Sequence, residues 1–349
     1  MRRLLPVRNR LLRAVGRGVD LRDASVETTE LHPEEVEAVR PAVFLDGQLE
    51  RATGAVSGHG TLAGELALAT RIRAPHAPVV RYTLENCLVH YGGVDYQGGA
   101  LRKHAIRTRP LLSERIHHRR RAVYCMSAVS HQYFGHWLQD ACATALLRDP
   151  DEALFLDLRE DWPHAREYAA AFGFAPEPAG LHFVERLSVY EDHGQGAHKR
   201  RRYAELRRRL AAAMGEAADA GAKLYFRRGD TGVARLVAND DEVTRALTAD
   251  GFETFDVAGA SAGDIWRRFS RARVVVSMDG SHLNHLYFAM PPDSLLLTFI
   301  PADHFTMTQT GYAAAARLRY AFLVVDPTPG GYAVPIPDLL RTLARADAA

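Results

Sequence analysis

The residues with the clearest chemical potential follow a run of three valines in the sequence VVVSMDGSHLNHLYF, residues 274–288. A short β-branched run that ends in a small polar turn predicts a buried strand, and the segment after it has helix-forming character. Ligands of open α/β sheets bind beyond the carboxyl ends of such strands. The candidate binding residues in this turn are Asp279, Gly280, Ser281, His282 and His285.

A phosphate, a sugar hydroxyl and a metal ion are the three ligands to consider for this turn. Glycine lets a ligand approach the backbone closely, and free amides at a helix start favour an anion, so a phosphate is the first expectation. Asp279, His282 and His285 have the spacing D-x-x-H-x-x-H. On a helix these steps spread the side chains over more than one face, so we assign no metal site. A buried supporting role for His285 fits equally well.

A second group of polar residues, RRGDTGVARLVAN, occupies positions 227–239 directly after an expected strand. Arginines at the carboxyl end of a strand can grip a diphosphate through forked, charge-assisted hydrogen bonds. Ordinary surface charge around a turn at Gly229 and Asp230 explains the same pattern. The candidate binding residues here are Arg227, Arg228, Arg235 and Asn239, and Asn239 is also the expected N-cap of the next helix.

A third group lies in HQYFGHWLQD, residues 131–140. His136 and Asp140 are four residues apart, so they share a helix face, and a histidine or carboxylate at such a junction can act as a general base. His131 is a candidate for binding substrate. The alternative is structural: the polar residues cap the helix and Trp137 packs into the core.

Composition and missing motifs exclude several classes of protein. The 44 basic and 42 acidic residues give a formal net charge of +2, and no basic stretch carries interleaved aromatic residues, so nucleic acid is not an expected partner. The sequence contains no G-x-S-x-G, P-loop or H-E-x-x-H motif. Cys87, Cys125 and Cys142 are widely spaced among apolar neighbours, which is typical of reduced, buried thiols in a cytosolic protein.

The N-terminal sequence, MRRLLPVRNRLLRAVGRGV, is basic and lacks the uninterrupted apolar core of a secretory signal. No run of about 18 apolar residues predicts a membrane-spanning helix. This segment fits either a basic amphipathic helix that lies on a membrane or a mobile tail. We therefore expect a cytoplasmic protein, and peripheral contact with the inner face of the membrane through this segment is one option.

Strands and helices alternate in the C-terminal half, which predicts a parallel, doubly wound α/β sheet. The expected strands are Lys223–Phe226, Phe252–Val257, Arg273–Ser277, Ser294–Ile300 and Tyr320–Val325. The expected helices are His198–Ala218, Asp240–Ala249, Ser261–Arg271 and Asp338–Ala344. Ser261 with Asp264 three residues later is a capping pair.

The N-terminal half carries weaker signals. Pro33 followed by two glutamates predicts a helix start within residues 31–42. Val79–Gly99 predicts a hairpin or small meander, and Ala122–Met126 a short buried strand. Residues 127–135 are expected to form a polar and aromatic loop before a helix over His136–Leu147.

The ordered set FGHWLQD, YFRRGDTGVARLVANDDEV and VVVSMDGSHLNHLYF resembles glycosyltransferase family 61, in particular its bacterial capsular-polysaccharide-type members. The family pattern is an HWLxD segment, then an arginine block with Asn-Glu, then a Gly-Phe strand and a glycine loop after a valine-rich strand. Gly251-Phe252 and Asn239–Glu242 stand at matching places. The resemblance covers roughly residues 122–300. Many members have His-Gly-Ala-Gly in the glycine loop, where this chain has Asp279-Gly280-Ser281-His282.

The resemblance implies a GT-B-like architecture, with two Rossmann-like domains that face a central cleft. Residues 1–205 would form the acceptor side and residues 206–349 the nucleotide-sugar-binding domain. Transfer would invert the anomeric centre without an essential metal, and the nucleotide-sugar donor would be the only co-substrate. Arg228 and Arg235, with backbone amides near Gly280, would stabilise the departing diphosphate. We prefer Asp140 as the base, with His136 beside it.

The resemblance also implies a glycan or lipid-linked glycan as the acceptor. The alternative function is a non-catalytic scaffold that recognises a glycan or nucleotide within a polysaccharide assembly system, which the altered loop at Asp279 would suit. A metal-dependent hydrolase that uses Asp279, His282 and His285 is a weaker third hypothesis.

Overall fold

The structure, a computed structural model, describes residues 2–56, 60–102, 111, 113–215, 221–228 and 235–349. The chain divides into two compact units. Unit 1 comprises Met1–Glu35 and His76–Gly194, and unit 2 comprises Val36–Pro75 and Gln195–Ala349. Gly229 and Asp230, named above as turn residues, lie outside the described residues. No helix among the described residues is long and apolar enough to cross a membrane.

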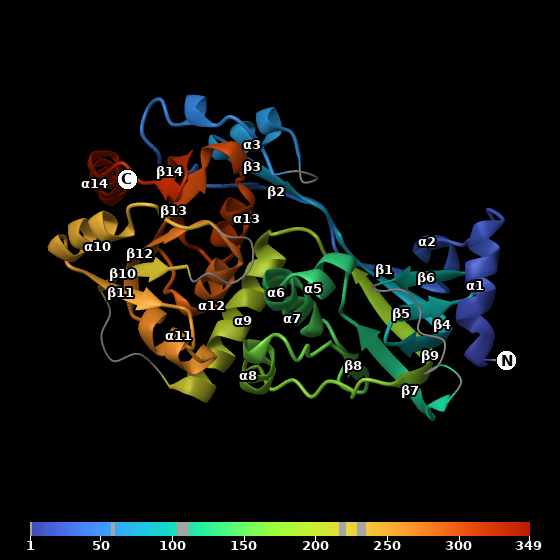
Figure 1. The fold of residues 1–349 in the computed structure, drawn as a ribbon. Helices are drawn as coiled ribbons and strands as arrows, with labels where there is room; N and C mark the ends of the chain where they lie inside the picture. Colours follow the sequence, from blue (N-terminus) through green and yellow to red (C-terminus); the bar gives the residue numbers. More distant parts are fainter. Residues whose placement is uncertain (1, 57–59, 103–110, 112, 216–220, 229–234) are drawn as a thin grey trace. The chain divides into compact units, whose positions relative to one another are not determined.

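Unit 2 is built on a six-stranded sheet with the order β11-β10-β12-β13-β14-β15 (Figure 1). The first five strands are parallel, and β15 joins β14 in antiparallel fashion. The strands are β10 (Ala222–Arg227), β11 (Phe252–Asp256), β12 (Ala272–Met278), β13 (Leu295–Pro301), β14 (Arg319–Thr328) and β15 (Gly331–Ala333). In chain order the parallel strands read 2-1-3-4-5, one of the common doubly wound orders. The parallel, doubly wound sheet predicted for this half is confirmed.

The helices of unit 2 cover both faces of this sheet. Those in its second segment are α9 (Ala197–Met214), α10 (Asp240–Ala249), α11 (Ala262–Phe269), α12 (Leu286–Ala289), α13 (Thr308–Ala315) and α14 (Ile336–Ala348), with 3-10 turns η4 (Ser281–His285) and η5 (Ala302–His304). The segment 36–75 adds β2 (Glu35–Ala38), η2 (Leu49–Arg51), α3 (Leu62–Ala69) and β3 (Arg73–His76), and β2 pairs with β3.

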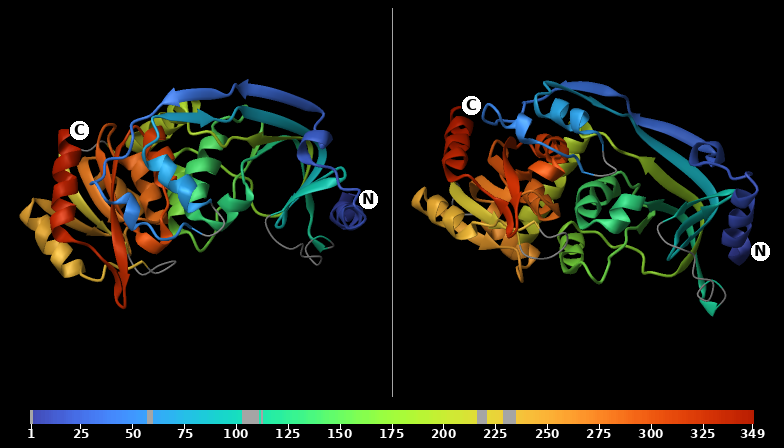
Figure 2. Two further views of the ribbon diagram at one scale, coloured as in Figure 1. Left: turned by 90° about the horizontal axis from the view of Figure 1, so that it is seen from above. Right: turned by 45° about the horizontal axis from the view of Figure 1, so that its top comes forward.

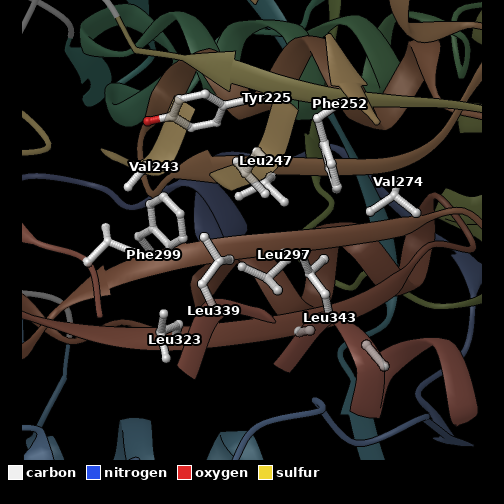
Figure 3. Close-up of a cluster of buried hydrophobic side chains, with 14 of the residues drawn as sticks. Tyr225, Val243, Leu247, Phe252, Val274, Leu297, Phe299, Leu323, Leu339 and Leu343 are labelled. Carbon is white, nitrogen blue, oxygen red and sulfur yellow. The ribbon is translucent and has the colours of Figure 1, made fainter. Parts of the chain in front are cut away.

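The core of unit 2 lies where α10 and α14 pack on the sheet (Figure 3). Because side chains of a strand alternate between faces, Tyr225, Val274 and Leu297 point toward these helices. Leu247 of α10 and Leu339 of α14 meet them and are fully buried. Each buried side chain of this size contributes about 1.5–3 kcal/mol, so the sheet is a firm frame for the loops at its edge.

The opposite face of the sheet packs on α11 through aromatic rings. The ring centroids of Phe226 and Phe269 are 4.6 Å apart, and Phe255 lies 5.4 Å from Phe269. The capping box predicted for α11 is present, since Ser261 accepts from the amide of Asp264 and Asp264 accepts from that of Ser261. α10 has the predicted bounds, but the side chain of Asn239 makes no cap hydrogen bond.

Unit 1 contains a seven-stranded mixed sheet of order β6-β5-β4-β9-β7-β8, with β1 also paired to β4. Its strands are β1 (Glu27–His32), β4 (Val79–His90), β5 (Gly93–Tyr96), β6 (Gly99–Arg102), β7 (Ile116–Tyr124), β8 (Ala153–Phe155) and β9 (Leu181–Glu191). Among the strand pairs of this sheet that the structure describes, those of β7 with β8 and with β9 are parallel and the others antiparallel. The meander expected over Val79–Gly99 is confirmed as β4, β5 and β6.

The helices of unit 1 are short, as the two views of Figure 2 show. Those within the described residues are η1 (Arg2–Leu4), α1 (Leu5–Ala14), α2 (Leu21–Ala24), α5 (Ala128–Gln132), α6 (Phe134–His136), α7 (Cys142–Ala145) and α8 (Pro163–Ala171), with the π-helical turn η3 (Trp137–Ala141) between α6 and α7. The three cysteines are buried and unpaired, as expected, and burial raises the pKa of each thiol.

Two expectations for the N-terminal half are wrong. The helix expected within residues 31–42 is replaced by β1 and β2, because pairing of β1 with β4 outweighs the local signal of Pro33 and the glutamates. The loop expected over 127–135 contains α5, which begins with a capping box between Ser127 and Ser130.

Candidate functional site

The site in unit 2 lies where the direction of the doubly wound sheet reverses. The chain goes from β10 to its neighbour β11 on one side and then crosses back to β12 on the other side. Such a switch point leaves a crevice outside the carboxyl ends of the two central strands, and ligands bind there. Arg228 directly follows β10, and Asp279 directly follows β12. The fold therefore brings two of the sequence motifs to one place.

Asp279 is the centre of the contacts at this edge. Its carboxylate Oδ2 accepts from Arg235 Nη1 at 2.7 Å, and its Oδ1 accepts from Gln309 Nε2 at 2.9 Å. Its backbone carbonyl accepts from Arg228 Nη1 at 2.9 Å and from Arg235 Nη1 at 3.3 Å. The Asp279 side chain is 3% exposed and that of Arg235 14%. Asp279 therefore holds Arg235 through its buried carboxylate and Arg228 through its backbone carbonyl.

Arg228 is a partly buried cation beside a second cation. Burial lowers its pKa, and Arg235 lowers the pKa further, while the carboxylate of Asp279 acts in the opposite direction. Among the side chains described at this edge, two guanidinium groups accompany the single carboxylate of Asp279. Guanidinium groups in this arrangement can bind an anion that has several hydrogen-bond-accepting oxygens, such as a diphosphate.

Gly280 makes room for the guanidinium of Arg228. A Cβ at this position would lie 2.7 Å from Arg228 Nη1 and 2.9 Å from its Cζ. The backbone of Gly280 is extended, with φ 162°, so space rather than backbone strain selects glycine here. The sequence predicts that a ligand approaches this glycine, and in the structure the group that lies close to it is the guanidinium of Arg228.

His282 is a buried neutral imidazole at the same edge. Ser277 Oγ donates to the carbonyl of Phe226 at 2.6 Å, so its single hydrogen is used there. His282 Nε2 lies 2.8 Å from Ser277 Oγ. Since the serine hydrogen is already used, Nε2 carries a hydrogen and donates to Ser277 Oγ. Nδ1 is left as an acceptor with no partner among the described residues. Burial, then the charges of Arg228 and Arg235, lower the pKa of His282 to about 3.

Other predicted residues of unit 2 have different surroundings. Arg227 Nε lies 3.0 Å from a carboxylate oxygen of Asp256 and 3.4 Å from one of Asp240. Asn239 donates to the carbonyl of Val334 and accepts from its amide, both at 2.9 Å. Arg227 therefore contacts β11, on the other side of β10 from β12, and Asn239 contacts the residue after β15.

The remaining residues of the glycine loop lie in η4. Ser281 is exposed, and its carbonyl accepts from Asn284 at 2.6 Å. His285 is 3% exposed. Among the residues the structure describes, no group of three His, Cys, Asp or Glu side chains could hold a metal ion.

His136 and Asp140 in unit 1 form a contact pair. His136 Nδ1 lies 2.8 Å from Asp140 Oδ2, and both side chains are about one quarter exposed, at 29% and 24%. Asp140 belongs to the π-helical turn η3, a rare local structure that is frequent at functional sites. A carboxylate on Nδ1 fixes the tautomer of an imidazole and makes Nε2 the acceptor, so this pair can accept a proton.

His131 lies in a chain of three groups. Its Nδ1 is 3.1 Å from Asp157 Oδ2, and its Nε2 is 2.9 Å from Tyr124 Oη. His131 and Tyr124 are buried. Burial, with a smaller effect of Asp157, raises the pKa of Tyr124 well above its usual value. Sequence reasoning missed Tyr124, Asp157 and, in unit 2, Gln309, because each stands outside the motifs and only the fold brings it near.

A cavity of about 630 Å³ opens beside this chain of groups. Its volume lies within the range of small-molecule sites. Tyr124 and Asp157 are part of its wall, and His136 and Asp140 are not among its lining residues. Its other aromatic and charged side chains are His90, Tyr91, Phe155, Arg159, Glu160, Arg166, Glu177 and His182. Aromatic faces combined with polar groups of both signs suit a ligand that has both apolar faces and hydroxyl groups, such as a sugar.

These features define an α/β protein with two arginines at a sheet edge in one unit and a histidine–carboxylate pair in the other. The model of the family Glycosyltransferase 61 matches residues 134–297, a little under half of the chain. The matched range contains His136, Asp140 and the whole arginine and glycine-loop region. The match supports glycosyltransferase family 61 and a glycosyltransferase role for this chain.

Other comparisons add little. No curated protein matches the chain. A rubredoxin oxygen:oxidoreductase from Desulfovibrio gigas is 10% identical over 61% of this chain and 50% of its own length, with a TM-score of 0.26. A mutant flavo di-iron protein from Thermotoga maritima is 9% identical over 65% of this chain and 54% of its own, with a TM-score of 0.28. The chain thus spans about half the length of these structures, and at such TM-scores the likeness carries no argument.

Proposed function

We propose that the protein transfers a sugar from a nucleotide-sugar donor to a glycan acceptor. The observation that carries this proposal is the convergence of Arg228 and Arg235 on Asp279, at the switch point of a doubly wound sheet. The match to Glycosyltransferase 61 over this region supports it. The donor side lies within residues 206–349 and the acceptor side within residues 1–205. We also propose that the two domains have a GT-B-like fold.

In the proposed reaction an acceptor hydroxyl oxygen attacks the anomeric carbon while the bond from that carbon to the diphosphate breaks. The electron pair of that bond leaves with the diphosphate, whose growing negative charge the guanidinium groups of Arg228 and Arg235 stabilise. Attack opposite to the leaving group inverts the anomeric centre. No step of this scheme calls for a metal ion, because the two arginines supply the positive charge.

The proton of the acceptor hydroxyl passes to the pair of His136 and Asp140. The contact between His136 Nδ1 and Asp140 suggests that His136 Nε2 takes this proton and Asp140 orients the ring. The sequence alone favours Asp140 as the base. Replacing each residue separately decides whether His136 or Asp140 is the base.

We propose that the cavity of unit 1 takes the acceptor glycan. Its size and its mixture of aromatic and charged side chains support this role. Arg166 is exposed and lines the cavity, so Arg166→Ala should raise the KM for the acceptor and leave donor affinity unchanged. The finer setting, synthesis of bacterial surface or capsular polysaccharide at the cytoplasmic face of a membrane that presents a lipid-linked acceptor, rests on the sequence resemblance.

A thermal-shift screen with a panel of nucleotide-sugars tests the donor site. A bound donor stabilises the folded protein by mass action, so the shift identifies the donor. Arg228→Ala should lower the affinity for the donor about tenfold to a hundredfold, as expected for the loss of one charge-assisted contact with a phosphate. Arg227→Ala, the neighbouring arginine that is paired with Asp256, should have the smaller effect.

Two results would contradict the proposal in different ways. If no nucleotide-sugar shifts the melting temperature of the wild-type protein, the donor site is wrong. If a donor binds but no sugar is transferred to any glycan or lipid-linked glycan tested, the non-catalytic scaffold is the better description.

A further inference from the structure

Helix α1 contacts unit 1 through buried and polar side chains of its inner face, among which Asn9 makes the most hydrogen bonds. Asn9, fully buried, donates from Nδ2 to Asp95 Oδ1 at 2.9 Å and to the carbonyls of Tyr96 and Gly99 at 2.8 and 2.6 Å. Arg13 donates to the carbonyl of Ala100. Figure 1 shows α1 beside β5 and β6, the strands that supply these acceptors. The inner face of the helix is thus fixed by polar contacts.

The outer face of the same helix is apolar and exposed. Leu4, Val7, Leu11 and Val15 are 56%, 44%, 65% and 67% exposed. Their spacing of three or four residues places them on one side of the helix, roughly opposite Asn9. They are four of the twelve exposed large hydrophobic side chains in the described part of the chain. Val7 and Leu11 lie in α1, and Leu4 and Val15 are its N-cap and C-cap residues, so the four form a patch rather than the scattered exposure that is normal for a surface.

Arginines border this apolar face on both sides. Arg8 and Arg10 are exposed, and helical geometry places one on each flank of the row that contains Leu11. Neither makes an ion pair within the residues that the structure covers. Residues 2–19 contain six arginines and no acidic residue. The surface is therefore apolar along its centre and positive along its edges.

We propose that this face of α1 docks on a membrane surface rich in anionic lipid. A helix that lies in the interface buries an apolar stripe among the acyl chains while its flanking cations meet the phosphate groups of the lipids. A partner protein helix would need a matching apolar stripe with acidic flanks, whereas an anionic bilayer offers both features everywhere on its surface. The proposal deepens the membrane setting proposed above and does not depend on sugar transfer.

Vesicle co-sedimentation of the full chain tests this inference. We expect the protein to pellet with vesicles of phosphatidylcholine mixed with phosphatidylglycerol, and to stay in solution with vesicles of phosphatidylcholine alone. Leu11→Asp should lower the partition coefficient about tenfold or more, because an aspartate replaces a leucine in the acyl region. Leu340→Asp, a matched change at a leucine of α14 that is 40% exposed, should bind as the wild type does.

The arginines are tested by the double substitution Arg8→Gln with Arg10→Gln. Each cation near an anionic surface strengthens binding, so the pair should lower partitioning roughly tenfold or more. The binding of the wild type should also weaken as salt is added. Unchanged melting temperatures for all variants would show that the exposed positions do not affect folding.

Several outcomes would overturn the proposal. Failure of the wild type to pellet with anionic vesicles excludes a membrane as the partner. Equal pelleting with neutral vesicles excludes a role for anionic lipid. Wild-type binding by Leu11→Asp excludes this face of α1. A wild-type dimer that Leu11→Asp converts to a monomer in light scattering assigns the face to a second copy of the chain.

Discussion

Replacing Asp279 with asparagine removes the carboxylate that pairs with Arg235 and whose charge also acts on Arg228, and it keeps the size of the side chain. The new asparagine could accept from Arg235 through its side-chain oxygen. If the side-chain amide of Gln309 flips, its oxygen accepts from the new asparagine amide. The nitrogen of Gln309 then donates to the hydroxyl of Tyr287, which in the wild type donates to the oxygen of Gln309. The hydrogen bonds therefore survive, and the substitution isolates the loss of negative charge.

The expected loss of stability is large because the ion pair is buried. The Asp279 and Arg235 side chains are 3% and 14% exposed, and removing one partner of a buried pair costs about 3–5 kcal/mol. Since the hydrogen bonds are kept, we expect the lower end, about 3 kcal/mol. For a unit of this size that loss lowers the melting temperature by roughly 6–12 °C. Asp256→Asn is the control, because Asp256 and Arg227 form a similar pair at 3.0 Å with 57% and 41% exposure. It should cost about 1 kcal/mol or less.

The assay compares the melting temperatures of Asp279→Asn, Asp256→Asn and the wild type with and without inorganic pyrophosphate. An anion bound by the two arginines replaces the missing charge, so pyrophosphate should bind Asp279→Asn more tightly than the wild type and recover much of the lost stability. Equal stability of Asp279→Asn and the control would refute a counter-ion role for Asp279. Weaker binding of pyrophosphate to Asp279→Asn would show instead that precise placement of the arginines matters more than charge.

Three further predictions concern the same two sites. Gly280→Ala should weaken donor binding about tenfold in calorimetry with little change in stability, because its Cβ displaces the guanidinium of Arg228 while the extended backbone accepts alanine; unchanged affinity would contradict the close approach. His282 has its pKa lowered from 6.5 to about 3, so the folded state excludes a proton that the unfolded chain binds, and stability present above pH 6.5 is lost as the pH falls from 6.5 toward 3. His282→Gln should flatten this acid limb in melting curves, and an unchanged slope would show that His282 is not its cause. His136→Asn should lower kcat about a hundredfold to ten-thousandfold with donor affinity unchanged, and Asp140→Asn should have the smaller effect if His136 is the base; the opposite order would make Asp140 the base.

Local signals in the sequence predict the C-terminal half well. The valine-rich and aromatic runs of β10, β12 and β13 and the capping box of α11 are encoded within a few residues, and each forms as expected. Strand–helix alternation then leaves few topologies, because parallel strands need crossover helices. The switch point could not be placed, since the sequence does not say that β11 and β12 lie on opposite sides of β10.

The N-terminal half is less predictable because its strands are long and pair with distant partners. β7 begins at Ile116, six residues before the expected strand, and includes the basic run Arg119–Arg121. Its pairing with β9, more than sixty residues later, gives these charged residues a strand conformation that their local sequence does not favour. The contact of His131 with Asp157 is hidden in the same way, although these two residues are closer in the sequence.

The glycine loop shows what a motif can and cannot reveal. The sequence marks Asp279 as a departure from the family's usual histidine and leaves its role open. In the structure both carboxylate oxygens of Asp279 and its carbonyl are engaged by Arg235, Gln309 and Arg228, and its side chain is 3% exposed. A carboxylate with both oxygens hydrogen-bonded inside the protein and almost no exposed surface is poorly placed to meet a substrate hydroxyl, so Asp279 is a positioning residue in our proposal.

That role follows from charge. Two neighbouring guanidinium groups repel each other, and burial raises the energy of both, so the protein without donor needs a negative charge between them. A histidine in this place would be neutral or positive and could not serve. The acidic loop of this chain therefore fits a donor site whose arginines are held ready before the diphosphate arrives, and the pyrophosphate experiment on Asp279→Asn measures that dependence directly.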